Sequence, residues 1–238
     1  MKHTEIVFLI DKSGSMANLV GDTIGGFNGF IEGQKAVEGK ATLTTILFDT
    51  YMKTIHDGVD IREVKQITAS DYMVGGATAM LDAIGDTINK VQDRHDELGA
   101  EKPESVLFVI TTDGEENSSH KYNKSQIEKM IKHQTNGHGW KFMFLGANMD
   151  AVKEAANIGI NKDSSVTYAY SSVGTRAVYD TLDCVAKAVR CDYDIDSLSS
   201  VYAASVDTLS NAKSYCDGIT VTASDKVDDS LVTKIATL

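Results

Sequence analysis

Short apolar runs alternate with segments of helical periodicity along most of this chain. The first run, EIVFLI at residues 5–10, is almost continuously apolar, as expected for a strand covered on both faces. Later runs with strand character lie at residues 41–49, 104–113, 140–148 and 165–170. Between them apolar residues recur every three or four positions, most regularly from Leu81 to Leu98. This alternation predicts an α/β domain, doubly wound around a mainly parallel sheet and ending near residue 195.

Two local features qualify that pattern. Residues 51–56 follow the run at 41–49 after a tight connection, which predicts an antiparallel hairpin. Gly25, Gly26 and Gly29 lie inside the helix expected after Met16, and each costs about 1 kcal/mol relative to alanine. Clustered glycines therefore predict a close approach of this helix to the sheet, or a break near Gly25.

Three polar segments follow predicted strands or open predicted helices. In open α/β sheets, ligand sites gather beyond the carboxyl ends of the strands. The segments are DKSGS (11–15), GGAT (75–78) and DGEE (113–116). Their short oxygen-bearing side chains are Asp11, Ser13, Ser15, Thr78 and Asp113. Hard oxygen donors of this kind suit Mg²⁺, Mn²⁺ or Ca²⁺ rather than zinc or copper.

The spacing of the first segment also matters. Residues 11, 13 and 15 project to one side only where the chain is extended or looped, as at the end of a strand. Gly14 would permit the turn, and Ser15 could cap a helix that begins at Met16. Two carboxylates and three hydroxyls would roughly neutralise a divalent cation, so its Lewis acidity would remain available to one more anionic oxygen.

The D-x-S-x-S motif, the isolated Thr78 and the Asp113 of TTDG resemble the metal-ion-dependent adhesion site of the von Willebrand factor A (VWA) domain. All five positions match in type and order, and the resemblance covers roughly residues 3–172, more loosely to 195. It implies a Rossmann-like fold with one antiparallel edge strand and a Mg²⁺-type ion on the upper rim. Ser13, Ser15 and Thr78 would be direct ligands, with Asp11 and Asp113 often acting through water.

The resemblance also implies a partner protein whose carboxylate completes the ion's coordination. Intracellular bacterial and phage members often act beside AAA-type ATPases or in multiprotein assemblies, so an ATPase or a virion protein is the expected partner. The residues expected on the ligand-binding rim are Gly14, Gly76, Gly114 and Glu115. Glu115 and Glu116 are expected to be a solvated charge pair rather than ligands, and Gly76 to shape its loop.

Charge and cysteine content restrict the expected partners and the expected cellular location. The 34 acidic and 23 basic side chains leave a formal charge of −11, which disfavours nucleic acid and anionic membranes as partners. No apolar run approaches the roughly 18–20 residues of a membrane span, and the N-terminus does not resemble a signal peptide. The three widely spaced cysteines are expected to be free thiols: Cys184, Cys191 and Cys216. A cytoplasmic location is expected, or the virion for a phage-encoded protein.

Enzymatic alternatives fit less well. A phosphohydrolase of the haloacid-dehalogenase type needs a second acid two residues after the first, where this chain has Ser13. No G-x-S-x-G elbow and no Walker or dinucleotide-binding glycine pattern follows a strand. The expected function is therefore an ion-dependent protein-binding module and not an enzyme. A structural or scaffolding component is the second reading, and a Mg²⁺-dependent phosphohydrolase the third.

The predicted domain covers residues 1–195 and is followed by an acidic, partly helical extension at 196–238. Residues 191–238 hold eight Asp and three Lys, so about five of the eleven net negative charges lie in this fifth of the chain. Leu198, Val201 and Tyr202 share one predicted helical face. Such helices either fold back on the domain or dock on a partner.

Overall fold

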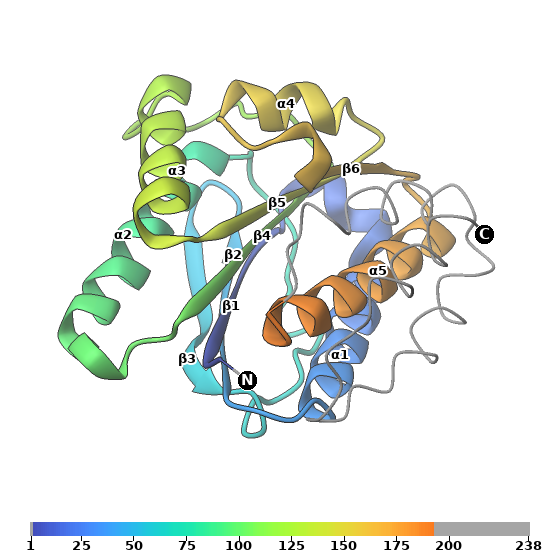
Figure 1. Ribbon diagram of the computed structural model, residues 1–238. Helices are drawn as coiled ribbons and strands as arrows, with labels where there is room; N and C mark the ends of the chain where they lie inside the picture. Colours follow the sequence, from blue (N-terminus) through green and yellow to red (C-terminus); the bar gives the residue numbers. More distant parts are fainter. Residues whose placement is uncertain (1, 193–238) are drawn as a thin grey trace, which may run out of the picture.

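A computed structural model describes residues 2–192 of the chain and shows a twisted sheet between two layers of helices (Figure 1). The strands are β1 (Thr4–Asp11), β2 (Ala41–Phe48), β3 (Met52–Asp60), β4 (Ser105–Thr112), β5 (Lys141–Ala147) and β6 (Ser165–Tyr168). Their order in the sheet is β3-β2-β1-β4-β5-β6. Only the β2–β3 pair is antiparallel among these strands. The predicted Rossmann-like α/β class and the antiparallel edge strand are both confirmed.

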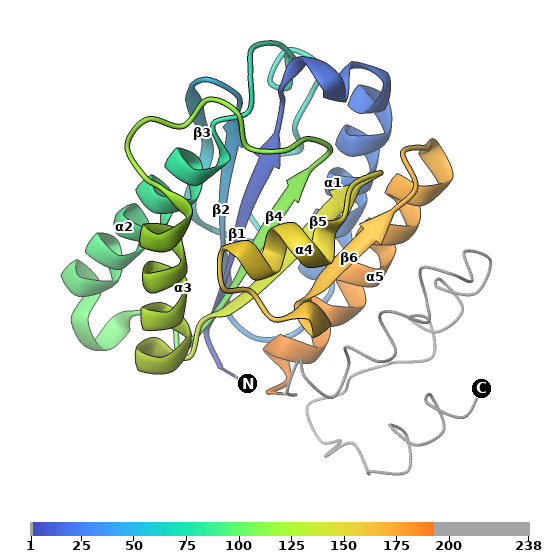
Figure 2. The ribbon, with the colours of Figure 1, turned by 90° about the horizontal axis from the view of Figure 1, so that it is seen from above.

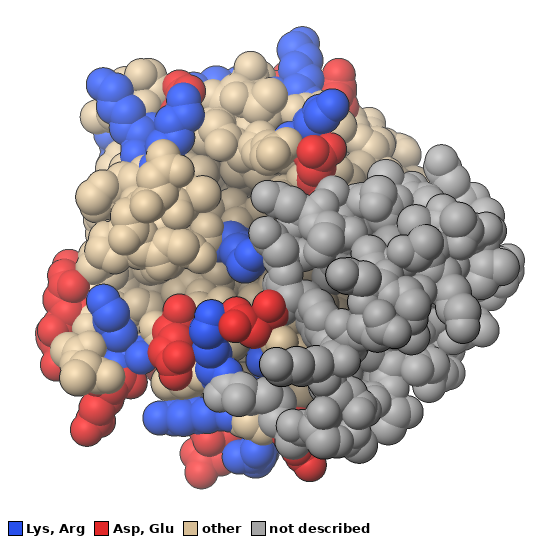
Figure 3. Space-filling view, in the orientation of Figure 1, with Lys and Arg blue, Asp and Glu red and all other residues tan. Residues whose placement is uncertain are grey.

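The helices divide between the two faces of the sheet (Figure 2). They are α1 (Val20–Lys35), α2 (Met80–Leu98), α3 (Lys124–His138), α4 (Ala151–Asn157) and α5 (Ser172–Arg190). Short 3₁₀ segments are η1 (Gly14–Leu19), η2 (Gly99–Glu101) and η3 (Lys162–Ser164). Helices α1 and α5 cover one face, and α2, α3 and α4 cover the other. Basic and acidic side chains are interspersed on the face drawn in Figure 3.

The continuous apolar run of β1 serves both layers at once. Ile6, Phe8 and Ile10 belong to the core beneath α1 and α5, whereas Val7 and Leu9 belong to the core beneath α2, α3 and α4. All five side chains are fully buried. Because side chains alternate between the faces of a strand, a central strand with helices on both sides must be apolar at every position.

The glycines of α1 allow close packing against a helix rather than against the sheet. A Cβ atom at Gly26 would lie 2.4 Å from the Tyr179 ring, and one at Gly33 would lie 2.5 Å from the Asp183 carboxylate, both on α5. The helix runs without interruption through Gly25. The predicted break is therefore wrong, and the close approach is real but involves α5. The helix also starts later than expected, because Met16 lies in η1.

Arg190 fastens the end of α5 to the end of α1. Its side chain is 1% exposed, and its guanidinium donates hydrogen bonds to backbone carbonyl oxygens. The acceptors are Gln34 at 2.6 Å, Val37 at 3.1 Å, and Glu38 and Gly39 at 3.2 Å. These bonds add donors to carbonyl groups at and just beyond the end of α1, where the helix supplies few of its own. Burial lowers the pKa of Arg190.

The cysteine prediction is partly wrong. Cys184 is disulfide-bonded, while Cys191 is a free thiol. Cys184 is therefore not one of the free thiols from which a reducing compartment was expected, whereas Cys191 is. Cys216 and the extension predicted at 196–238 lie outside the described residues, as does the boundary at 195. Among residues 2–192, no helix combines the length and apolar character needed to cross a bilayer.

Candidate functional site

Asp11 is the last residue of β1 and is fully buried. One carboxylate oxygen, Oδ1, accepts the Ser13 N–H at 2.7 Å, and Oδ2 accepts the Thr112 hydroxyl at 2.6 Å. Both donors are neutral. Burial raises the pKa of Asp11 from its ordinary 3.8 to about 6, although these two hydrogen bonds oppose the rise. The end of β1 thus holds a carboxylate that is costly to ionise unless a cation lies nearby.

The hydroxyl of Ser15 joins the first segment to the third. Ser13 Oγ and Ser15 Oγ lie 3.1 Å apart, and Ser15 Oγ donates to Asp113 Oδ1 at 2.6 Å. Asp113 follows β4, the strand beside β1 in the sheet. Burial also raises the pKa of the Asp113 carboxyl. Two hydroxyls and a second carboxylate therefore form one connected group at the carboxyl ends of β1 and β4.

Thr78 brings the second segment to the same place. It is buried just before α2, and its backbone N–H donates to the Asn117 side chain at 2.9 Å. The Asn117 N–H in turn donates to the Thr78 carbonyl oxygen at 3.1 Å. A Cβ atom at Gly114 would lie 3.5 Å from Thr78 Oγ1 and 3.8 Å from Ser15 Oγ. The hydroxyls of Thr78 and Ser15 thus both border Gly114, so all three predicted segments converge.

The rim glycines have different roles. Gly76 has φ +71°, and a Cβ atom there would lie 2.9 Å from Thr50 Oγ1, so this position requires glycine. Its carbonyl oxygen accepts the Gly14 N–H at 3.2 Å. Gly14 does not have a left-handed backbone, and a Cβ atom there would meet only the Gly76 carbonyl oxygen, at an ordinary 3.7 Å. Gly14 is therefore compatible with the turn, as expected, but the backbone there does not require glycine.

The predicted capping role of Ser15 is also wrong. The helical segment begins at Gly14, so Ser15 lies inside η1 rather than before it. Its hydroxyl contacts Ser13 and Asp113 instead of backbone N–H groups. The side chain is therefore directed toward the candidate site, where Asp11 also lies.

Glu115 and Glu116 are not a matched pair. Glu115 is exposed on the rim, but the Glu116 carboxylate accepts backbone N–H groups of Leu81 at 2.8 Å, Ser118 at 2.8 Å and Ser119 at 2.7 Å. Glu116 and Asn117 thereby tie the loop after β4 to the start of α2. Sequence reasoning missed both roles, because each depends on a contact between segments about 35 residues apart.

The side chain of Lys12 lies beside the site, but its ammonium group does not contact the five oxygen-bearing residues. Its ammonium forms an ion pair with the Asp49 carboxylate, which also accepts the Tyr51 N–H at 2.7 Å. The Lys12 carbonyl oxygen accepts the Gly75 N–H at 2.8 Å. Asp49 was not among the predicted site residues, since nothing in its local sequence marks it. The pair links the loop after β1, the turn after β2 and the loop that carries Thr78.

Among residues 2–192, no group of three or more His, Cys, Asp or Glu side chains is arranged to hold a metal ion. The site at the ends of β1 and β4 has a different composition, with two carboxylates and three hydroxyls: Asp11, Asp113, Ser13, Ser15 and Thr78. Hard oxygens alone fit a cation of the Mg²⁺ type and not a softer metal.

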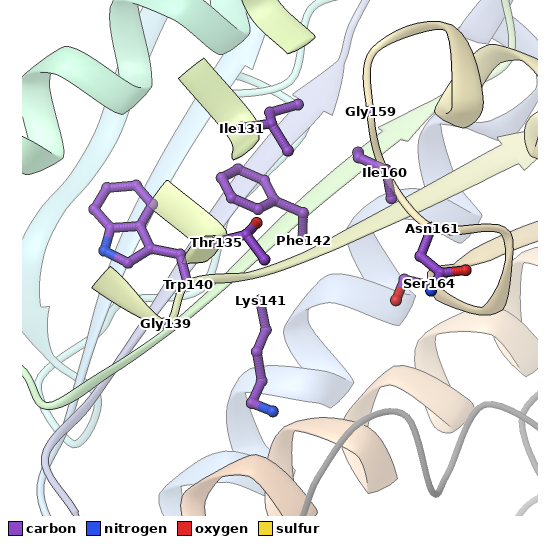
Figure 4. Close-up of a pocket in the computed structure, with 10 residues that line it drawn as sticks. All are labelled: Ile131, Thr135, Gly139, Trp140, Lys141, Phe142, Gly159, Ile160, Asn161 and Ser164. Carbon is purple, nitrogen blue, oxygen red and sulfur yellow. The ribbon is translucent and has the colours of Figure 1, made fainter. Parts of the chain in front are cut away.

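A separate hollow lies at the opposite end of the sheet (Figure 4). It has a volume of about 310 Å³ and lies where α3 ends and β5 begins. Ile131, Phe142 and Ile160 are among its apolar lining residues, and Asn161 and Ser164 are polar. Since the candidate site lies at the carboxyl ends of the strands, this hollow does not belong to it.

Comparisons with known proteins agree with the observed topology. The chain matches "von Willebrand factor type A from Catenulispora acidiphila" with a TM-score of 0.51 and 14% identity, over 76% of this chain and 42% of that one. It has a VWA fold. A second match is manganese-loaded TRAP protein of Plasmodium vivax, with a TM-score of 0.54 and 19% identity, over 71% of this chain and 69% of that one.

A third structure with this fold is proximal thread matrix protein 1 of the mussel byssus, with a TM-score of 0.53 and 16% identity. The match covers 76% of this chain and 45% of that protein, so the VWA fold described here spans less than half of it. No protein-family model matches the chain. No curated protein matches it either. At these identities the likeness concerns the VWA fold alone.

Proposed function

We propose that this chain is a metal-ion-dependent protein-binding module. In this proposal a Mg²⁺-type ion accepts a carboxylate from a partner protein. The residues that would hold the ion are Asp11, Ser13, Ser15, Thr78 and Asp113. The observation that carries the proposal is the connection from Ser13 Oγ to Ser15 Oγ at 3.1 Å and on to Asp113 Oδ1 at 2.6 Å, with Thr78 Oγ1 beside Gly114.

The surroundings of the five residues favour direct coordination for some of them and contact through water for others. The hydroxyls of Ser13, Ser15 and Thr78 would be direct ligands. Asp11 already accepts one hydrogen bond on each oxygen, which favours action through water. The bound ion would supply a Lewis acid for the partner's carboxylate. Mn²⁺ or Ca²⁺ could take the same position, and the TRAP structure that shares the fold is manganese-loaded.

The same residues argue for binding rather than catalysis. A phosphohydrolase built on Asp11 needs a proton donor two residues later. Ser13 stands there, with its N–H on Asp11 and its hydroxyl facing Ser15. We therefore propose no enzymatic activity. We expect the partner to be a protein in a larger assembly, such as an AAA-type ATPase or a virion component, and the location to be the cytoplasm or the virion.

A structural use of the fold is the second candidate. The similarity to a byssal matrix protein supports it, since that protein's name describes a matrix component. In this reading the chain would bind through another surface without an ion. The two candidates differ in whether chelation of divalent ions changes binding.

The test is a thermal-unfolding series with EDTA, Mg²⁺ or Mn²⁺. Wild type should gain several degrees with millimolar ion, because a ligand that binds only the folded state stabilises it. Ser13→Ala and Thr78→Ala should lose most of that gain, whereas Ser70→Ala, an exposed hydroxyl outside the site, should keep it. Equal melting temperatures with EDTA and with about 10 mM ion would contradict the proposal. That concentration is on the order of 10 to 100 times the dissociation constants of weak divalent-cation sites in proteins.

A further inference from the structure

Trp140 lines two hollows at the end of the sheet where β4 and β5 begin. One is the hollow of Figure 4. The other has a volume of about 380 Å³ and lies between the ends of α2 and α3 and the segment that leads into β4. We call it the His95 hollow, and its lining includes His95, Trp140, Pro103, Val106, Lys102 and Glu104. Its volume is within the usual range of small-molecule sites.

The ring of His95 is held through one of its two nitrogen atoms. The residue is 3% exposed, and Nε2 lies 2.7 Å from Glu5 Oε2. The other oxygen of the Glu5 carboxylate accepts the Thr44 hydroxyl at 2.7 Å and the Arg94 guanidinium. An ionised carboxylate only accepts hydrogen bonds, so the hydrogen is on Nε2 of the histidine. In the neutral ring, Nδ1 is then an acceptor.

The indole of Trp140 supplies a donor beside this acceptor. Trp140 is also 3% exposed, and its ring centroid lies 5.9 Å from that of His95. In Figure 4 the indole nitrogen points away from the other labelled side chains, and so not into the hollow drawn there. Among residues 2–192 neither His95 Nδ1 nor Trp140 Nε1 forms a hydrogen bond, yet neither atom is sealed from solvent. The His95 hollow therefore presents one acceptor and one donor on neighbouring rings.

The rest of the lining favours a flat and neutral ligand. Pro103 and Val106 are buried and apolar, and the Trp140 ring adds an aromatic surface. The formally charged lining residues are Lys102 and Glu104, which are exposed and of opposite sign. Their charges offset each other, so the hollow favours neither an anion nor a cation. Apolar and aromatic surface with a few fixed polar atoms is typical of sites for small organic molecules.

We infer that the His95 hollow binds a small, neutral, planar molecule with a cyclic amide edge, of the kind found in pyrimidine and purine bases. The ligand N–H donates to His95 Nδ1, and the ligand carbonyl oxygen accepts the Trp140 N–H. In a cyclic amide these two groups lie side by side on one edge of the ring, so one ligand satisfies both protein atoms. The hollow lies at the end of α2 remote from Thr78, and the inference does not depend on the proposed function.

The two ring nitrogens also give the hollow a means of discrimination. Both belong to buried side chains, and buried polar groups in proteins are nearly always hydrogen-bonded. A ligand that lacks either the N–H or the carbonyl group leaves one of them without a partner, which lowers affinity. Glu5 acts as a positioning residue, because its contact with Nε2 fixes which nitrogen of His95 accepts.

The first test uses the full chain and the fluorescence of Trp140, the only tryptophan in the sequence. Uracil is the probe, because it is small, neutral and planar and has a cyclic amide edge. A saturable change in emission is expected, with a dissociation constant of about 10 mM or below. The N,N′-dimethyl derivative, which has no N–H, should bind at least about threefold more weakly. Benzoate, which has only acceptors, should bind about tenfold more weakly.

The second test removes the indole N–H and keeps an aromatic ring. In a calorimetric titration Trp140→Phe should weaken uracil binding about three- to tenfold, since one hydrogen bond is lost. Thr135→Ala changes the lining of the hollow in Figure 4 instead, and it should bind uracil like the wild type. The comparison of uracil with its dimethyl derivative is made on the wild type, so it does not depend on a variant that folds.

Absence of saturable uracil binding at about 20 mM overturns the site. Equal affinities for uracil and its dimethyl derivative, or for wild type and Trp140→Phe, overturn the assigned hydrogen bonds. Tighter binding of benzoate than of uracil overturns the neutral ligand. An equal loss in Thr135→Ala and Trp140→Phe would place the ligand in the hollow of Figure 4 and overturn its assignment to the His95 hollow.

Discussion

The hydroxyl of Ser15 donates a 2.6 Å hydrogen bond to the carboxylate of Asp113, a residue 98 positions later in the chain. The two residues follow neighbouring parallel strands, β1 and β4, whose register brings Ile10 opposite Thr111. Parallel strands end at the same edge of a sheet, so loops from distant parts of the sequence meet there. This contact turns two separate motifs into one candidate site.

Asp11→Asn should stabilise the ion-free protein at neutral pH. Because the pKa of Asp11 is raised from 3.8 to about 6, the folded state binds more protons than the unfolded state between these values. Wild type with EDTA should therefore become more stable as pH falls from 7 toward 4, apart from other groups. At pH 7 the neutral Asn removes a cost of about 3 kcal/mol or less.

Urea unfolding at pH 7 and pH 4.5 measures this effect. With EDTA, Asp11→Asn should be more stable than wild type at pH 7, with a much smaller difference at pH 4.5. In millimolar Mg²⁺ the order at pH 7 should reverse, because only wild type retains the carboxylate. A variant that is less stable than wild type in EDTA at pH 7 would contradict the assignment of a costly buried charge.

Gly76→Ala should weaken ion binding, since it strains a left-handed backbone and pushes on Thr50 and Asp49 beside Thr78. Gly75→Ala is the matched control, because a Cβ atom there has no heavy atom within 4 Å. Calorimetric titration with Mn²⁺ should show a loss of about tenfold or more for Gly76→Ala and little change for Gly75→Ala. Equal affinities in the two variants would mean that the loop does not position Thr78.

Gly26→Ala should destabilise the fold by roughly 1–3 kcal/mol, because its methyl group would overlap the Tyr179 ring on α5. Gly25→Ala, one position earlier in the same helix, meets nothing within 4 Å. It should stabilise α1 by about 0.5–1 kcal/mol through helix propensity. Denaturant midpoints of the pair give opposite signs if α1 and α5 pack as described, and the same sign if they do not.

Arg190→Ala should cost several kcal/mol, on the order of 3, because it removes several hydrogen bonds from a buried guanidinium to carbonyl groups at the end of α1. Arg190→Lys should recover only part of that loss, since an ammonium cannot match the planar guanidinium on several carbonyls. Hydrogen exchange at residues 34–39 reports the site of the change. Protection there that is unaffected by Arg190→Ala would contradict the capping role.

Local pattern predicted the elements of this fold well, and tertiary contacts explain where it failed. The apolar run of β1 and the polar residues after it follow directly from a strand buried on both faces that ends at a ligand-bearing edge. The starting point of α1 could not be predicted, because η1 continues the helical periodicity back to Met16. The glycines of α1 indicated a close neighbour but not which one.

Within the candidate site, the five oxygen-bearing residues could be named from their motifs because each lies at the end of an element. The supporting residues could not. Asn117, Glu116 and Asp49 act on segments about 35 residues away, and their local sequences are ordinary for polar turns. The disulfide bond of Cys184 could not be predicted either, because an odd number of widely spaced cysteines favours free thiols.

The most direct test of the central claim is an anomalous-difference map from crystals of the full chain grown with Mn²⁺. A single strong peak is expected within coordination distance of the hydroxyls of Ser13, Ser15 and Thr78, and it should be missing from crystals of Ser13→Ala grown in the same way. A map with no peak between β1, β4 and the start of α2, or with the peak at another group of residues, would contradict it.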